Sequence, residues 1–126
     1  MHASVSVRTV LAALIFMSTV VTQAATFVYV SNADSQEISV LSLDAAKNDV
    51  FLVQTVPVGG QVMPLAVSPD RKHLYAALRT QPHSVASFGI DAESGRLTPM
   101  GVNPLPDSMA YIATDRTGRY LSLIHI

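Results

Sequence analysis

The chain is 126 residues long, carries a formal net charge of −1 and contains no cysteine. A charge balance this close to neutrality offers no basic patch that would hold nucleic acid or an anionic membrane. The absence of cysteine excludes disulfides, thiolate chemistry and zinc sites built on cysteine.

The first predicted element is a helical secretory signal peptide over residues 1–24. Arg8 precedes an apolar run over residues 10–21, and residues 22–25 are mostly small. This order is typical of signal peptides. The run is short against the ~20 residues that a spanning helix needs, which favours cleavage after Ala24 over an uncleaved anchor. We therefore expect an exported protein, periplasmic or secreted, without a stable membrane anchor.

The rest of the chain reads as short strands separated by turn-forming residues. Runs of β-branched and aromatic residues with alternating polarity predict strands, and Asn48-Asp49, Ser68-Pro69-Asp70 and Gly95 predict the turns between them. No later segment has a helical apolar stripe, so the predicted fold class is all-β. The expected strands cover residues 27–30, 38–43, 50–58, 65–67, 74–78, 85–90 and 97–102.

These strands recur at a nearly constant spacing. Val28-Tyr29-Val30 matches Leu74-Tyr75-Ala76 at a distance of 46, and residues 38–44 match residues 85–91 at 47. Further matches join Phe51 to Leu97 at 46, and Val67 to Ile112 and Asp70 to Asp115 at 45, with extra residues expected in the turn around Gly118. A period of roughly 40–50 residues with four strand-like pieces is typical of β-propeller blades.

The repeat predicts how residues 25–126 are organised. One blade-like unit covers about 27–73, a second covers about 74–120, and a third has just begun when the chain ends. We expect two adjacent four-stranded antiparallel sheets, forming part of a presumed seven-bladed ring in a longer protein. Repeat arrays need about three units to bury a continuous core. The alternative is a complete two-sheet domain that associates with its own copies; the sequence leaves the oligomeric state open.

Several of these segments together resemble the amino-terminal part of the bacterial seven-bladed β-propeller lactonases, the 6-phosphogluconolactonase-like family. The resemblance covers nearly all of the chain after residue 25, but only two blades of the family. The matching segments are Val28-Tyr29-Val30-Ser31, residues 38–44, Gly60-Gln61-Val62-Met63-Pro64, Val67-Ser68-Pro69-Asp70, Leu74-Tyr75, Arg79, Thr114-Asp115 and Gly118-Arg119.

The resemblance implies an enzyme that hydrolyses a sugar lactone to the acid. No cofactor or metal is expected, because the sequence has no Gly-rich phosphate loop and no His-rich metal spacing. The family is associated with the pentose phosphate pathway, but the signal peptide would carry this chain away from cytoplasmic phosphosugars. A non-phosphorylated sugar lactone or another cyclic ester is then the expected substrate. Two alternatives stay open: a non-catalytic exported propeller of the YVTN type, which binds or scaffolds, and a propeller that carries an electron-transfer cofactor.

Five residues are candidates for substrate binding: Gln61, Arg79, His83, Asp107 and Ser108. Lactone hydrolysis needs an activated water, a group that stabilises the oxyanion and a proton donor for the ring oxygen. The links at one end of a propeller would bring these five residues together. Arg79 can hold a carboxylate, a phosphate or an oxyanion, Gln61 can orient a carbonyl, and His83 can titrate near neutral pH.

Structural roles are the alternative for the same residues. Gln61 can satisfy backbone groups, Arg79 can pair with Asp34 or Glu37, and His83 can simply lie in solvent. The catalytic residues are expected in later blades and are not identified in this sequence, so we expect the 126-residue chain to be inactive by itself.

Overall fold

The computed structural model describes residues 25–125, which contain nine strands and no helix. The all-β prediction is therefore confirmed. The predicted signal peptide and its cleavage after Ala24 lie outside the described residues. Within residues 25–125 no helix could cross a bilayer. The strands are β1 Thr26–Asn32, β2 Glu37–Asp44, β3 Asp49–Pro57, β4 Val62–Val67, β5 His73–Leu78, β6 Ser84–Ile90, β7 Leu97–Pro104, β8 Met109–Thr114 and β9 Leu121–His125.

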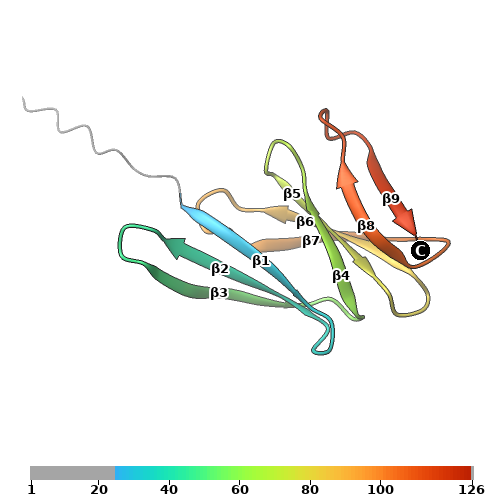
Figure 1. Ribbon diagram of the computed structural model, residues 1–126, viewed down its shortest axis with the longest axis horizontal. Coiled ribbons are helices and arrows are strands. Elements are labelled where there is room, and N and C mark those ends of the chain that lie inside the picture. Colours follow the sequence, from blue (N-terminus) through green and yellow to red (C-terminus); the bar gives the residue numbers. More distant parts are fainter. Residues whose placement is uncertain (1–24, 126) are drawn as a thin grey trace, which may run out of the picture.

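The nine strands form three antiparallel sheets that follow one another along the molecule (Figure 1). Sheet A has the order β1-β2-β3, sheet B the order β4-β5-β6-β7, and sheet C contains β8 and β9. The expected grouping into two four-stranded sheets is wrong, because β4 pairs with β5 and so begins sheet B. Gly59, with a φ of 76°, lies in the link that carries the chain from β3 to the next sheet.

The structure nevertheless preserves the repeat that the sequence predicts. β1, β2 and β3 are the counterparts of β5, β6 and β7, and β4 is the counterpart of β8. The pairing irregularity between Val40 and Leu41 of β2 recurs 47 positions later, between Ser87 and Phe88 of β6. A β-bulge bends a strand and increases its local twist. The two sheets therefore bend at equivalent positions.

Strand pairing corrects three of the matches made from sequence. Leu97 pairs with Ile90 as Val50 pairs with Leu43, so the counterpart of Leu97 is Val50 and not Phe51.

The other two corrections lie in the last hairpin. Val67 pairs with Leu74, and Thr114 pairs with Leu121 in the same way. The two turns therefore have equal length, which makes Thr114 the counterpart of Val67 and makes Ser68 the counterpart of Asp115. Matching Asp70 with Asp115 by residue type shifted that alignment by two positions.

The main core lies between sheets A and B. Ile38 and Val40 of β2 pack with Leu74 of β5 and Phe88 of β6, and all four side chains are buried. Polar bonds also join the two sheets. The Gln54 amide donates from Nε2 to the Leu97 carbonyl oxygen at 3.2 Å, and the Leu97 N–H donates to Gln54 Oε1 at 2.8 Å. A second, smaller core between sheets B and C contains Ala77, Met109 and Ile112.

The other face of sheet A has no cover among the described residues. Strand pairing places Val28, Leu41 and Leu52 side by side, and alternation along β2 turns them away from Ile38 and Val40. We define the outer face of sheet A by the apolar residues that point to this side: Val28, Val30, Leu41, Leu43, Val50 and Leu52.

Exposure distinguishes this face from its counterpart in sheet B. Val28 is 39% and Leu52 64% exposed, whereas Leu74, the counterpart of Val28, is fully buried against sheet A. Because β1 corresponds to β5, sheet A also lacks a counterpart of β4, and no described strand pairs with the outer edge of β1.

Candidate functional site

The fold places all five candidate residues at one end of sheet B. Gln61 directly precedes β4, Arg79 follows β5, His83 precedes β6, and Asp107 and Ser108 lie in the link between β7 and β8. In an antiparallel sheet the start of one strand lies beside the end of its neighbour. These positions therefore share the end at which β4 starts and β5 ends (Figure 1).

The segment before β4 and the loop after β5 are joined by two hydrogen bonds. The Arg79 backbone N–H donates to the Gln61 carbonyl oxygen at 2.8 Å, and the Gln61 backbone N–H donates to Thr80 Oγ1 at 2.9 Å. Gly60 makes this approach possible, because a Cβ at that position would lie 3.3 Å from the Thr80 Cβ and Oγ1 atoms. Thr80 was not a candidate from the sequence, since nothing in its local pattern marks a bond to a residue 19 positions away.

Arg79 and His83 each carry a buried nitrogen without a partner. Nε of Arg79 and Nδ1 of His83 are sealed from solvent, and neither has a hydrogen-bond partner among the described residues. Both residues are half-buried as a whole. The His83 carbonyl oxygen accepts a hydrogen bond from the Leu105 N–H at 2.8 Å, which holds this loop against the link to β8.

Asp107 and Ser108 form part of the link itself. The Ser108 N–H donates to Oδ1 of Asp107 at 2.7 Å. Asp107 is exposed and Ser108 is half-buried. The carboxylate of Asp107 therefore helps to shape the turn that leads into β8.

The other aspartates mostly shape turns. Asp91 accepts hydrogen bonds from the Ser94 and Glu93 N–H groups at 2.9 Å each, and these bonds, that of Ser94 first, lower the pKa of Asp91. The Ser68 hydroxyl, followed by the Lys72 N–H, likewise lowers the pKa of Asp70. Carboxylates with a lowered pKa stay ionised at neutral pH and are poor proton donors. Within residues 25–125 no group of three or more His, Cys, Asp or Glu could hold a metal ion.

A hollow of about 240 Å³ lies next to the candidate residues. Gly60 and Thr80, the neighbours of Gln61 and Arg79, contribute to its wall together with Pro82. The five candidates themselves do not line it.

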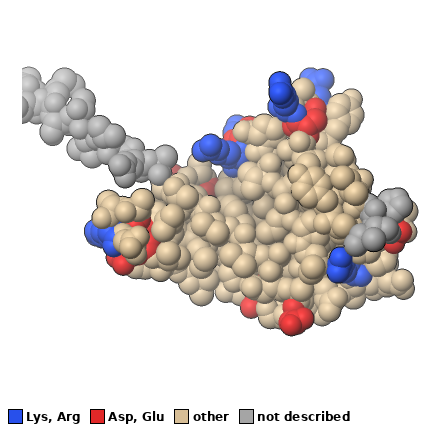
Figure 2. All heavy atoms as spheres, viewed as in Figure 1, with Lys and Arg blue, Asp and Glu red and all other residues tan. Residues whose placement is uncertain are grey.

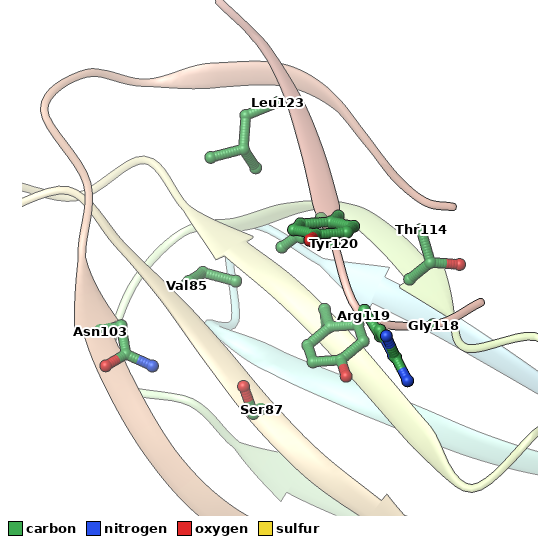
Figure 3. A pocket seen from close by; sticks show the side chains of 10 residues that line it. Val85, Ser87, Asn103, Thr114, Gly118, Arg119, Tyr120 and Leu123 are labelled. Atoms are coloured by element: carbon green, nitrogen blue, oxygen red, sulfur yellow. The ribbon is translucent and has the colours of Figure 1, made fainter. Parts of the chain in front are cut away.

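A larger hollow, of about 330 Å³, lies between sheets B and C. In Figure 3 Asn103 of β7 lies on one side of this hollow, and Thr114, Gly118 and Arg119 lie on the other. β6 and β7 of sheet B cover the inner face of sheet A. Sheet C has only two described strands, so no described strand covers β6 and β7 in the same way. We therefore interpret this hollow as uncovered space between sheets. The residues around this hollow could not be selected from the sequence, because they come from separate strands and share no motif.

Charged side chains gather at the turns and ends of the strands. Figure 2 shows broad uncharged surface over the middle of the face in view, with Lys, Arg, Asp and Glu at its margins. This distribution contains no extended basic surface on that face.

Comparison with known families and curated proteins gives consistent matches. The family model described as "Lactonase, 7-bladed beta-propeller" matches residues 19–123. A 6-phosphogluconolactonase of Yersinia pestis (strain Pestoides F) is 48% identical over 94 residues, which are 75% of this chain and 27% of that protein. A 6-phosphogluconolactonase of Pectobacterium atrosepticum is 46% identical over the same share of each chain. The chain thus spans about a quarter of the length of these relatives, 27%.

Solved structures resemble the fold as well. A candidate 6-phosphogluconolactonase from Bacteroides uniformis superposes with a TM-score of 0.71 at 25% identity, covering 77% of this chain and 29% of that one. The periplasmic gluconolactonase of Pseudomonas aeruginosa superposes with a TM-score of 0.64 at 24% identity, covering 79% of this chain and 30% of that one. The second likeness concerns the fold alone.

Proposed function

Because the chain belongs to the seven-bladed β-propeller lactonase family, we propose that it forms part of an exported lactonase that hydrolyses a sugar lactone to the sugar acid. The observation that carries this proposal is the 48% identity, over 94 residues, to a protein named 6-phosphogluconolactonase. The signal-peptide pattern of residues 1–24 supports export. Export in turn favours a lactone without a phosphate group, since phosphosugars belong to the cytoplasm.

The chemistry requires three events. The oxygen of a water molecule bonds to the lactone carbonyl carbon while the carbonyl electron pair moves to its oxygen. The resulting tetrahedral oxyanion then collapses, and the bond from carbon to the ring oxygen breaks. The ring oxygen takes up a proton and becomes a hydroxyl, and the new acid ionises to a carboxylate. Negative charge therefore develops first on the former carbonyl oxygen and ends on the product carboxylate.

In this proposal the candidate residues orient the lactone and stabilise the negative charge that develops during the reaction. The guanidinium of Arg79 would stabilise the oxyanion, since Arg donates several hydrogen bonds in a planar arrangement. The amide of Gln61 would orient the carbonyl beside it. The ionised turn aspartates are unsuited to donate the proton to the ring oxygen, so we assign that step to His83 or to a residue outside this chain.

An assay of the complete gene product that carries this sequence tests the proposal. We expect faster opening of glucono-δ-lactone than the spontaneous rate, followed by acid release at constant pH, with 6-phosphogluconolactone as the second substrate. Preference for glucono-δ-lactone supports the non-phosphorylated substrate. If neither lactone is turned over by folded full-length protein, the enzyme proposal fails and a binding or scaffold role takes its place.

A further inference from the structure

Two unpartnered nitrogens in the loop after β5 call for an explanation. Buried polar groups in folded proteins nearly always have a hydrogen-bond partner, because an unsatisfied one costs free energy. In the described part of the chain, Nε of Arg79 and Nδ1 of His83 are the buried side-chain atoms that lack a partner. Both belong to one five-residue loop, whose ends they form.

The strand pairing ends one position before these two residues. Leu78 at the end of β5 pairs with Ser84 at the start of β6. Arg79 and His83 are the next residues outward in this hairpin, where the same register would set them opposite each other. Opposed residues of an antiparallel pair point to the same side of the sheet. That side alternates with the one to which Leu78 points, so it is the side of sheet C, where Ala77 packs.

The loop that carries the two residues is held from both sides. The Arg79 N–H bonds to the Gln61 carbonyl, the Thr80 hydroxyl accepts from the Gln61 N–H, and the His83 carbonyl accepts from the Leu105 N–H. These bonds fix the two ends of the loop before any ligand arrives. A binding group that is already ordered loses less conformational entropy when the ligand binds.

We propose that Arg79 and His83 form an oxyanion-binding pair that takes the carboxylate of a sugar acid. This inference rests on the proposed function, because a sugar acid is the product of lactone hydrolysis. A buried guanidinium nitrogen without a hydrogen-bond acceptor is costly, and an anion that accepts from it offsets that cost. Nε of Arg79 and Nδ1 of His83 are themselves sealed, but both residues are half-buried as a whole, so the proposed anion enters past their solvent-exposed atoms. Charge-assisted hydrogen bonds from arginine to a carboxylate are among the strong ones.

Titration of the full 126-residue chain with gluconate, followed by NMR, tests this pair without requiring turnover. We expect saturable shifts of the Arg79 Nε–Hε signal and of the His83 ring signals. Inorganic phosphate and 6-phosphogluconate form the second arm, which separates a carboxylate site from a phosphate site. Sorbitol, which is uncharged, should leave both signals unchanged.

Matched variants make the test specific. Arg79→Gln should weaken gluconate binding about tenfold or more, the size expected for the loss of one charge-assisted hydrogen bond. Arg119→Gln, which changes an exposed arginine in another turn, should leave it unchanged. The proposal is overturned if gluconate moves neither signal, if Arg119→Gln weakens binding equally, or if only phosphate compounds bind. The lactonase assay of the complete protein is a separate measurement. A failed binding test therefore overturns the anion-binding pair and leaves the proposed activity to be decided by that assay.

Discussion

Arg71 and Gly118 occupy the same position in two turns that lie 47 residues apart, and both have a positive φ, of 60° and 71°. The first residue lies between β4 and β5, and the second lies between β8 and β9. The left-handed backbone region costs an ordinary L-residue about 1 kcal/mol through contacts of its Cβ, and glycine avoids that cost. The turn with Arg71 therefore carries backbone strain, whereas the turn with Gly118 avoids it.

Replacing Arg71 by glycine should stabilise the protein. We expect Arg71→Gly to raise the free energy of unfolding by roughly 0.5–1 kcal/mol, because the strain is removed at an exposed position. Urea unfolding of the two proteins measures the difference. Lys72→Gly is the matched control. Lys72 is the next residue and has no positive φ, so glycine there should destabilise the protein. Equal destabilisation by both variants would contradict the assignment of strain to Arg71.

In the same two turns, the residue with the hydroxyl and the residue with the carboxylate occupy opposite positions. Ser68 donates to Asp70 at 2.6 Å in the first turn, whereas Thr117 donates to Asp115 in the second. The bond from Ser68 is the largest cause of the lowered pKa of Asp70. An aspartate with a lowered folded-state pKa stabilises the fold above its usual pKa of about 3.9 and loses that contribution as pH falls through the folded-state value.

Removal of the Ser68 hydroxyl should therefore raise the pKa of Asp70 toward its ordinary range. NMR titration of the Asp70 carboxyl in Ser68→Ala measures this change. As the pH falls below about 4, the variant should also lose less stability than the parent, because it lacks the bond from Ser68 to the ionised Asp70 carboxylate. Ser35→Ala, at an exposed position in another turn, should leave the titration of Asp70 as it was. An unchanged Asp70 titration in Ser68→Ala would show that the hydroxyl does not control it.

Gln54 should be a strong determinant of the contact between sheets A and B. Gln54→Ala removes both bonds to the Leu97 backbone and leaves these backbone groups of a buried residue without those partners, so we expect a loss of about 1–3 kcal/mol. Thermal or urea unfolding measures the loss. Gln81→Ala changes an exposed glutamine of the β5–β6 loop and should stay within about 0.5 kcal/mol of the parent. Comparable losses in the two variants would rule out a special role for Gln54.

The outer face of sheet A should make the isolated chain self-associate. Leu52 is 64% exposed on this face, and contiguous exposed apolar residues favour association. Light scattering after size exclusion should show a mass that rises with concentration, and Leu52→Lys should lower it. Met100→Lys alters an apolar residue of sheet B that is 61% exposed and should have a smaller effect. A strictly monomeric parent chain would contradict this prediction.

The 126-residue chain should not hydrolyse lactones by itself. It spans 27% of the length of the 6-phosphogluconolactonases that it matches, and the catalytic residues are expected in later blades of the propeller. Purified chain should therefore open glucono-δ-lactone and 6-phosphogluconolactone no faster than buffer does. Turnover that persists through purification and is lost in Arg79→Gln would place the chemistry within this chain.

The sequence predicted the period of the repeat and most strand positions, because alternating apolar residues and turn formers depend on local backbone geometry. It did not predict the grouping of β4, since a repeat shows its spacing but not the position at which one sheet ends. Residue type also misled the match of Asp70 with Asp115, which only the pairing of Thr114 with Leu121 corrects.

The candidate residues were selected from their loops, and the structure places them at one end of sheet B. The bond from Gln61 to the Thr80 hydroxyl and the unpartnered nitrogens of Arg79 and His83 could not be predicted. Both depend on side chains from segments that are far apart in sequence. The binding roles of the five candidates stay predictions.

The open edge of β1 has a bearing on how the protein reaches its folded state. β1 is the first strand of the described chain, yet the position beside it has no strand from residues 25–125. A strand that pairs with this edge must come from outside residues 25–125 or from another molecule. A contact with a distant stretch of the same polypeptide forms late, because closing a long loop is slow. Until such a contact forms, β1 presents unpaired backbone groups that other chains can capture.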